Sequence, residues 1–268
     1  MPIKGFQARL AEPEEGLFLD GQGGSDVLGS WFGVFRDIPG RSGYIRTNGG
    51  LDSFRELLRD EWDQGFDLVD IEYINIENKP GIWYGVIHED NGRNAVDNKN
   101  NFDSFRENVN ERWDQGFKLV DVEYGNGTWV GVFQEGFERA ALDSSVNFDT
   151  FTGQIRDRWA QGFELVDVEF GDGRWVGIFG DENNYGTSVA SYAGDFNSFR
   201  QQVIDQNNEG FKLVDVESGD GLWFGVYQQD STYTNLFLKM NDLSSFENAI
   251  EEQWALGRDL ADIGVGFE

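Results

Sequence analysis

One acidic pair recurs along the chain inside the motif LVDVE and its close variants, and its spacing could support chemistry. Alternate residues of a β-strand project to the same face about 6 to 7 Å apart, so each Asp should lie beside its Glu. Carboxylate oxygens arrayed in this way suit a hard cation such as calcium, which takes about six to eight oxygen ligands. The copies are Asp70 and Glu72, Asp121 and Glu123, Asp167 and Glu169, Asp215 and Glu217, and Asp262, with Gly264 in place of a further Glu.

The same acidic pattern is compatible with roles that need no ion. The acidic face could simply be solvated, or each Asp could cap the backbone of a neighbouring unit or pair with its Arg. Paired carboxylates also serve glycosidases, which need an acid and a base or nucleophile about 5 to 9 Å apart. Such an enzyme usually breaks its repeat symmetry at one unique site, whereas the breaks in this chain look like loop changes. A structural role is therefore favoured over ion binding, and ion binding over catalysis.

Few other residues offer chemistry. The chain has no cysteine and one histidine, which removes thiol nucleophiles and most zinc sites and proton relays. His88 comes just after the second strand of the first unit, in the segment HEDNGRN, and no nucleophile or orienting group can be assigned to it. We therefore expect a surface-loop histidine and no catalytic residue. The segment DGQGGSD (20–26) lacks EF-hand spacing and is expected to be a flexible arm, and no nucleotide-binding glycine motif is present.

The composition narrows the range of partners. The 268 residues include 49 Asp and Glu against 21 Lys and Arg, a formal net charge of -28. Nucleic acids and anionic membrane surfaces both require clustered basic residues, so neither is expected as a partner. An aromatic content of 15% indicates a folded chain rather than a disordered acidic one. The start has no apolar signal-peptide core and no stretch is long enough to span a membrane, so we expect a soluble protein, cytoplasmic by default.

Five copies of one sequence unit follow an N-terminal arm (1–28). The segment FDSFRENVNERWDQGFKLVDVEYGNGTWVGVF (102–133) recurs as FDTFTGQIRDRWAQGFELVDVEFGDGRWVGIF (148–179) and in less similar copies before and after. The units span approximately 51–100, 101–146, 147–195, 196–242, and 243–268 completed by 29–50, and together they make one domain (29–268). Their marker tryptophans are Trp31, Trp83, Trp129, Trp175 and Trp223, spaced 52, 46, 46 and 48 residues apart.

The two chain ends are unequal parts of one unit. The segment LSSFENAIEEQWALGRDLADIGVGFE supplies a helix and a first strand, whereas SWFGVF (30–35) supplies only a second strand. Pairing these two strands would complete the last unit and remove exposed sheet edges. The sequence thus predicts an α/β repeat protein, a closed five-unit toroid of helix-strand-strand(-strand) units, with the ring closed by the N- and C-terminal half-repeats. The alternative is an open solenoid with two capping half-repeats.

Local signals define the elements of each unit. The helices carry an apolar stripe and end at a glycine suited to the left-handed conformation, namely Gly65, Gly116, Gly162, Gly210 and Gly257. We expect N-caps just before the first Phe of each helix, at Asp52, Asp103, Asp149, Asn197 and Ser244. Tight hairpins are predicted at Asn126-Gly127, Asp172-Gly173 and Asp220-Gly221. A weaker third strand is expected near 44–46, 140–142, 187–191 and 236–240.

The two-residue turn fixes the register of each hairpin. On one side it pairs Tyr124 with Trp129, Val122 with Gly131, and Val120 with Phe133. On the other side it pairs Glu123 with Val130, and Asp121 with Val132. The first side is apolar and should receive the helix. The marker tryptophans are therefore expected in the core rather than on a sugar-binding surface.

Variable loops follow the second strand of each unit, at 88–98, 134–139, 180–187 and 228–235. They differ in length and sequence while the scaffold stays constant, which is the usual division between a rigid frame and its binding loops. Their aromatic residues Phe137, Tyr185 and Tyr233 are the candidate ligand-binding side chains. A glycan or a protein or peptide is the expected ligand, and we expect a monomer.

The string RWDQGFKLVDVEYGNGTWVGVF resembles the short repeats of the bacterial tandem repeat domain family, which run Trp-x-x-Gly-aromatic, a strand, a Gly-rich turn and a second Trp. Similar repeats form the ring that precedes the β-lactamase-like catalytic domain of fungal polyglycine hydrolases. The resemblance covers about residues 30–268 and implies the recognition or scaffold part of such a protein. The chain lacks the Ser-x-x-Lys nucleophile motif of those hydrolases, so no catalytic residue is carried over.

Together these patterns favour a non-enzymatic, multivalent binding or scaffold protein that recognises a glycan or peptide through its inter-repeat loops. One alternative is a calcium-stabilised structural protein that uses a ring of Asp and Glu. A carboxylate-based hydrolase is the second alternative. No cofactor is expected except calcium.

Overall fold

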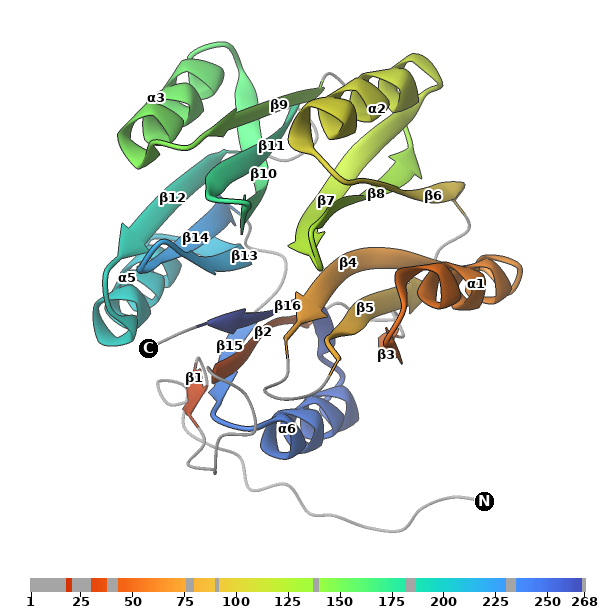
Figure 1. Ribbon diagram of the computed structural model, residues 1–268. Helices are drawn as coiled ribbons and strands as arrows, with labels where there is room; N and C mark the ends of the chain where they lie inside the picture. Colours follow the sequence, from red (N-terminus) through yellow and green to blue (C-terminus); the bar gives the residue numbers. More distant parts are fainter. Residues whose placement is uncertain are drawn as a thin grey trace, which may run out of the picture.

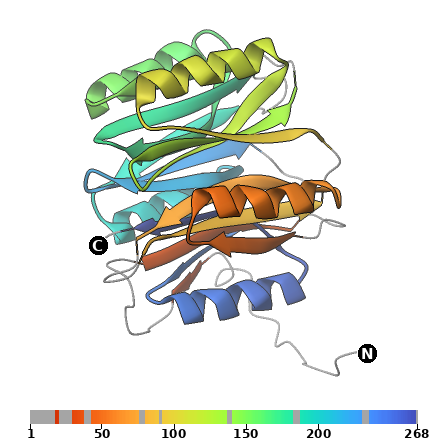
Figure 2. The ribbon, with the colours of Figure 1, turned by 45° about the vertical axis from the view of Figure 1, so that its right-hand side comes forward.

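The computed structural model describes residues 18–20, 30–37, 43–75, 80–89, 92–136, 140–181, 187–229 and 235–266. Within these residues one arrangement occurs five times, a helix packed on an antiparallel sheet. Figure 1 shows the five units around a common centre with their helices on the outside. Figure 2 shows the helices lying across the outer faces of the sheets. The prediction of five α/β repeat units is thus confirmed.

Four units have the same strand and helix content. The first comprises β3 (Gly43–Asn48), α1 (Leu51–Trp62), β4 (Phe66–Ile74) and β5 (Ile82–Glu89). The second comprises β6 (Asn94–Lys99), α2 (Phe102–Asp114), β7 (Phe117–Gly125) and β8 (Thr128–Glu135). The third comprises β9 (Ala140–Ser145), α3 (Phe148–Trp159), β10 (Phe163–Gly171) and β11 (Arg174–Asp181). The fourth comprises β12 (Ser188–Ala193), α5 (Phe196–Asn208), β13 (Phe211–Gly219) and β14 (Leu222–Gln229).

The last unit joins the two ends of the chain. It comprises β15 (Asn235–Met240), α6 (Leu243–Ala255), β16 (Asp259–Gly266), and β2 (Ser30–Arg36) from the N-terminal half-repeat. The predicted strand pairing is confirmed, since β16 pairs antiparallel with β2. A short additional strand, β1 (Phe18–Asp20), pairs in parallel with β15 and lies within the segment predicted to be an arm. The five sheets remain separate ladders within the described part of the chain.

In the first four units each third strand pairs with the hairpin that comes after it in the sequence. β3 pairs with β5 and β6 pairs with β8, so the three-dimensional unit runs strand, helix, strand, strand. It therefore begins one strand before the helix that opens the sequence repeat. β6 has no predicted counterpart, because its sequence NAVDNK is largely polar and carries a weak strand signal.

The turns and helix ends follow mostly from residue type. Asn126 and Gly127 both have positive φ, at 52° and 74°, as a tight hairpin turn requires, and the Asp-Gly turns match them. The predicted glycines that end the helices all have positive φ, between 78° and 91°. The predicted N-caps are wrong by two residues. The helices begin earlier, and in four of them the caps are Asn101, Asn147, Asp195 and Asp242, each accepting a hydrogen bond from the backbone N–H three residues on.

One predicted cross-strand pair is also wrong. Phe133 lies opposite Leu119 rather than Val120, because a β-bulge shifts the register between Leu119 and Asp121. The pairs nearer the turn, such as Asp121 with Val132, are as predicted. The same bulge occurs at the equivalent position of every unit. A bulge adds one residue to one strand, so the turn alone could not set the register beyond it.

The apolar side of each hairpin packs against the helix, as predicted. In the second unit Phe105 and Val109 of α2 share a core cluster with Leu119, Trp129 and Phe133. The five marker tryptophans are at most 3% exposed, so their predicted core position is confirmed. Gly131 makes room for this packing, because a Cβ there would lie 2.8 Å from Leu119 Cδ1 and 3.0 Å from Phe105 Cε2.

We predict that Gly131→Ala lowers the free energy of unfolding by about 1 to 3 kcal/mol, since the added methyl group overpacks the helix–sheet contact. Gly153→Ala is the matched control. Gly153 lies inside α3, and a Cβ added there would meet no atom within 4 Å, so this change should raise stability by up to about 1 kcal/mol. Urea unfolding of both variants provides the measurement, and equal effects of the two changes would contradict the packing described.

Candidate functional site

The inner strands of the five units carry the acidic pairs to the middle of the molecule. These strands are β4, β7, β10, β13 and β16 (Figure 1). Asp70, Asp121, Asp167, Asp215 and Asp262, together called the Asp layer, are only 6 to 8% exposed. The interpretation of this face as simply solvated is therefore wrong, because neighbouring units cover it.

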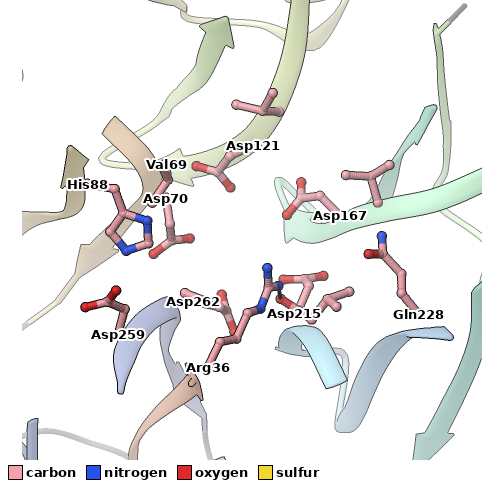
Figure 3. Close-up of a pocket in the computed structure, with 14 residues that line it drawn as sticks. Arg36, Val69, Asp70, His88, Asp121, Asp167, Asp215, Gln228, Asp259 and Asp262 are labelled. Carbon is pink, nitrogen blue, oxygen red and sulfur yellow. Dashed lines mark hydrogen bonds between the residues drawn. The ribbon is translucent and has the colours of Figure 1, made fainter. Parts of the chain in front are cut away.

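One cavity is lined by every member of the Asp layer. Its volume is about 180 Å³, and Arg36, His88 and Asp259 also line it. The valine or alanine at each β-bulge reaches the same cavity, namely Val69, Val120, Val166, Val214 and Ala261. Figure 3 shows carboxyl groups from different units turned toward the space between them, with the Arg36 guanidinium near Asp262 and Asp215.

Four members of the Asp layer accept a hydrogen bond from a backbone N–H of the neighbouring unit. The bonds join Asp121 Oδ2 to Ile71 N (2.9 Å), Asp215 Oδ2 to Val168 N (2.9 Å), Asp262 Oδ2 to Val216 N (3.2 Å) and Asp70 Oδ2 to Ile263 N (3.2 Å). The interpretation that each Asp caps a neighbouring backbone is confirmed for these four. The last bond links the first unit to the last.

Asp167 departs from this pattern. It is 8% exposed, and its Oδ2 atom is buried without a hydrogen-bond partner among the described residues. A buried acceptor without a donor loses its hydration and gains nothing in return. The Asp layer is thus chemically unequal at one of its five positions.

A second cavity, of about 210 Å³, is lined by Glu72, Glu123, Glu169 and Glu217, together called the Glu layer. Here too carboxylates accept from the neighbouring unit, since Tyr73 N donates to Glu123 (3.0 Å) and Tyr124 N donates to Glu169 (3.1 Å). The fifth position is Gly264, where a Cβ would lie 2.3 Å from Phe32 Cζ. The missing fifth Glu is therefore a consequence of packing against Phe32.

Burial raises the pKa of every carboxyl group in both layers. Removal from water is the largest cause throughout, and nearby carboxylates of the same cavity raise most of these values further. The pKa of Asp121 rises to about 8 despite the hydrogen bond from Ile71. Burial also raises the pKa of Asp262, but only to about 7, because the hydrogen bond from Val216 N–H and the charge of Arg36 oppose the effect of desolvation.

His88 and Arg36 supply the contacts that the sequence did not reveal. The prediction of a surface-loop histidine is wrong, because His88 lies in β5, is 3% exposed and donates from Nε2 to the Leu260 carbonyl at 2.7 Å. Arg36 donates from Nη2 to the Val214 carbonyl at 3.2 Å. Both occupy the position two residues after the core Val of their second strand, so alignment of the repeats by that Val could have found them.

The structure says less about the predicted calcium site and the predicted ligand-binding loops. No group of three or more His, Asp or Glu residues within the described ranges has an arrangement that could ligate one metal ion. Calcium binding by the two layers therefore stays a prediction. The candidate ligand-binding residues Phe137, Tyr185 and Tyr233 lie outside the described residues.

Comparisons with protein-family models, with curated proteins and with solved structures find no match to this chain. The resemblance to the bacterial tandem repeat domain family and to the repeats of polyglycine hydrolases therefore stays a prediction. No helix in the described part of the chain is long and apolar enough to cross a bilayer.

We predict that the protein becomes less stable as pH rises in buffer free of divalent cations. Carboxyl groups whose pKa is about 4 in the unfolded chain and about 7 to 8 in the folded protein, as for Asp262 and Asp121, make the folded state bind more protons in that interval. The free energy of unfolding should fall by about 1.4 kcal/mol per pH unit for each such extra proton. Thermal melts between pH 5 and 9 test this, and a melting temperature that rises with pH would contradict it.

Proposed function

We propose that this protein is a non-enzymatic binding or scaffold protein, built as a closed five-unit toroid around its two acidic layers. The single observation that carries the proposal is the hydrogen bond from Ile263 N to Asp70 Oδ2. It joins the last unit to the first in the same way as the bond from Ile71 N to Asp121 joins the first unit to the second. An open solenoid would leave Asp70 without this donor.

Other contacts at the junction of the first and last units support the closed form. The rings of Trp31 and Tyr84, which come from different units, are 5.3 Å apart in an edge-to-face arrangement. Both belong to one core cluster that also contains Phe246 of α6. The hydrogen bond between His88 and the Leu260 carbonyl crosses the same junction. Apolar burial and hydrogen bonding thus coincide there, as in the interior of a domain.

The acidic layers favour a structural use of the carboxylates over a catalytic one. Their oxygens accept backbone hydrogen bonds between units, which commits them to holding the units together. A hydrolase needs one acid and one base or nucleophile that face a substrate. A calcium-stabilised structural protein is the alternative that the balance of charge favours, because the buried carboxyl groups outnumber the one arginine that lines their cavity.

We predict that a circular permutant folds. Gly266 of β16 lies opposite Ser30 of β2, as Gly125 lies opposite Thr128 across the Asn-Gly turn. Joining Gly266 to Ser30 through Asn-Gly, and opening the chain between β8 and β9, should therefore replace the natural ends by a hairpin of the native type. Circular dichroism and thermal melting are the measurements, with a cooperative transition within about 10 °C of the parent expected.

The matched control for this permutant keeps the same new ends but joins Gly266 to Ser30 through a direct peptide bond. This connection cannot form the two-residue turn, so its strands should pair poorly. If the Asn-Gly permutant is unfolded, or melts no better than the control, the closed toroid is wrong.

We further propose that the variable loops carry the recognition function, with a glycan or peptide as ligand. The aromatic residues Phe137, Tyr185 and Tyr233 come from different units and would give several weak, similar sites. We predict binding on a glycan or peptide array that falls at least about tenfold when all three are changed to alanine. Arrays that stay blank for the native protein would exclude this ligand class.

A further inference from the structure

The orphan oxygen of Asp167 points to an occupant of the central cavity. Four members of the Asp layer have a backbone N–H donor for Oδ2, whereas Asp167 Oδ2 is buried without a partner among the described residues. Asp167 lines the same cavity as the other four (Figure 3). An acceptor in such a place is satisfied only by a ligand that donates hydrogen bonds or carries positive charge.

We infer that the cavity of the Asp layer binds one hydrated divalent cation, with Asp167 as its direct ligand and the other carboxylates as acceptors for its water. This inference rests on the proposed closed toroid, because Asp70 and Asp262 come from the first and last units. It narrows the calcium alternative to one cavity, one principal ligand and one mode of binding.

Once ionised, the carboxyl groups around the cavity leave a strong negative excess. Six carboxylates line it, the five of the Asp layer and Asp259, against one arginine and one histidine. Arg36 lies beside Asp262 and Asp215, and its charge opposes the rise that burial causes in the pKa of Asp262. Asp259 faces Arg36 across β16 and β2. The positive charge of Arg36 is therefore concentrated on one side of the cavity. A mobile cation would occupy the other side, next to Asp167 and Asp121.

The dimensions favour a hydrated ion over a bare one. At about 30 Å³ per water molecule, a cavity of about 180 Å³ holds roughly six waters. No three acidic side chains of the described chain are arranged to ligate one ion directly. Magnesium gives up its water reluctantly and is commonly held through one or two carboxylates, so it fits this arrangement better than a fully dehydrated calcium.

The Glu layer lacks the feature that marks the Asp layer. Among the buried side-chain atoms of the described residues without a hydrogen-bond partner, none is a Glu oxygen. The Glu layer also has one position fewer, at Gly264. The site is therefore assigned to the Asp layer alone, and one ion per chain is the expected stoichiometry.

The test titrates chelator-treated full-length protein with MgCl₂, and separately with CaCl₂, in a calorimeter at constant ionic strength. We expect one saturable site, and a melting temperature that rises by about 5 °C or more once the ion exceeds its Kd about 100-fold. Asp167→Asn should weaken binding at least about tenfold. The matched control Asp149→Asn removes the same charge from an exposed position in α3 and should bind like the parent.

Three further measurements keep the test decisive. Melting of Asp167→Asn without the ion shows whether it folds, and this isosteric loss of a buried charge should leave it at least as stable as the parent. Arg36→Gln should bind the ion more tightly, since a tethered positive charge is removed. Mn²⁺, used as a probe, should broaden the amide signal of Val168 in NMR spectra.

The outcomes separate this inference from the closed toroid. Absence of saturable binding, equal affinity of the Asp167→Asn and Asp149→Asn variants, or an equal stabilisation by NaCl at the same ionic strength would each overturn the cation site. None of these results affects the circular permutant. A permutant that fails to fold would instead remove the closed toroid on which the site rests.

Discussion

The hydrogen bond from a backbone N–H of one unit to a buried carboxylate of the next is the interaction on which the rest of the structure depends. The five sheets are separate ladders within the described part of the chain, so no continuous sheet joins the units there. Asp121 and Glu123 instead reach across to Ile71 N and Tyr73 N, and three further Asp residues and Glu169 make the same kind of bond elsewhere. These bonds set the spacing of the inner strands, and the apolar contacts between each helix and the next sheet fill the remaining space.

This mode of assembly carries an electrostatic cost. If side-chain amides accepted these backbone hydrogen bonds, the ring would be neutral. Carboxylates instead bring charge into a region away from water. The raised pKa values of Asp121 and Asp262 express that cost, and Arg36 offsets only part of it. A proton or a cation must supply the rest. The scaffold and the proposed ion site thus have one origin, the use of carboxylates as acceptors between the units.

The features that depend only on neighbouring residues could be predicted from the sequence. The period-two position of Asp121 and Glu123, the turn at Asn126-Gly127 and the helix end at Gly116 each follow from nearby residues alone. The burial of His88 and the packing at Gly264 depend on strands that are distant in sequence. The bulge at Val120 lies within one hairpin, but the type and position of the turn do not encode it. The orphan oxygen of Asp167 could not be predicted, because Asp121 and Asp215 lie in the same LVDVE motif and differ from it only in a contact with the neighbouring unit.

Amide hydrogen exchange at Ile263 tests the central claim most directly. Its N–H donates to Asp70 across the junction of the last and first units. The amides of Ile71, Val168 and Val216 make the equivalent bond between units that follow one another in the sequence. The closed toroid predicts that Ile263 exchanges within about tenfold of those three. Exchange about 100-fold or more faster at Ile263, with the other three protected, would contradict it.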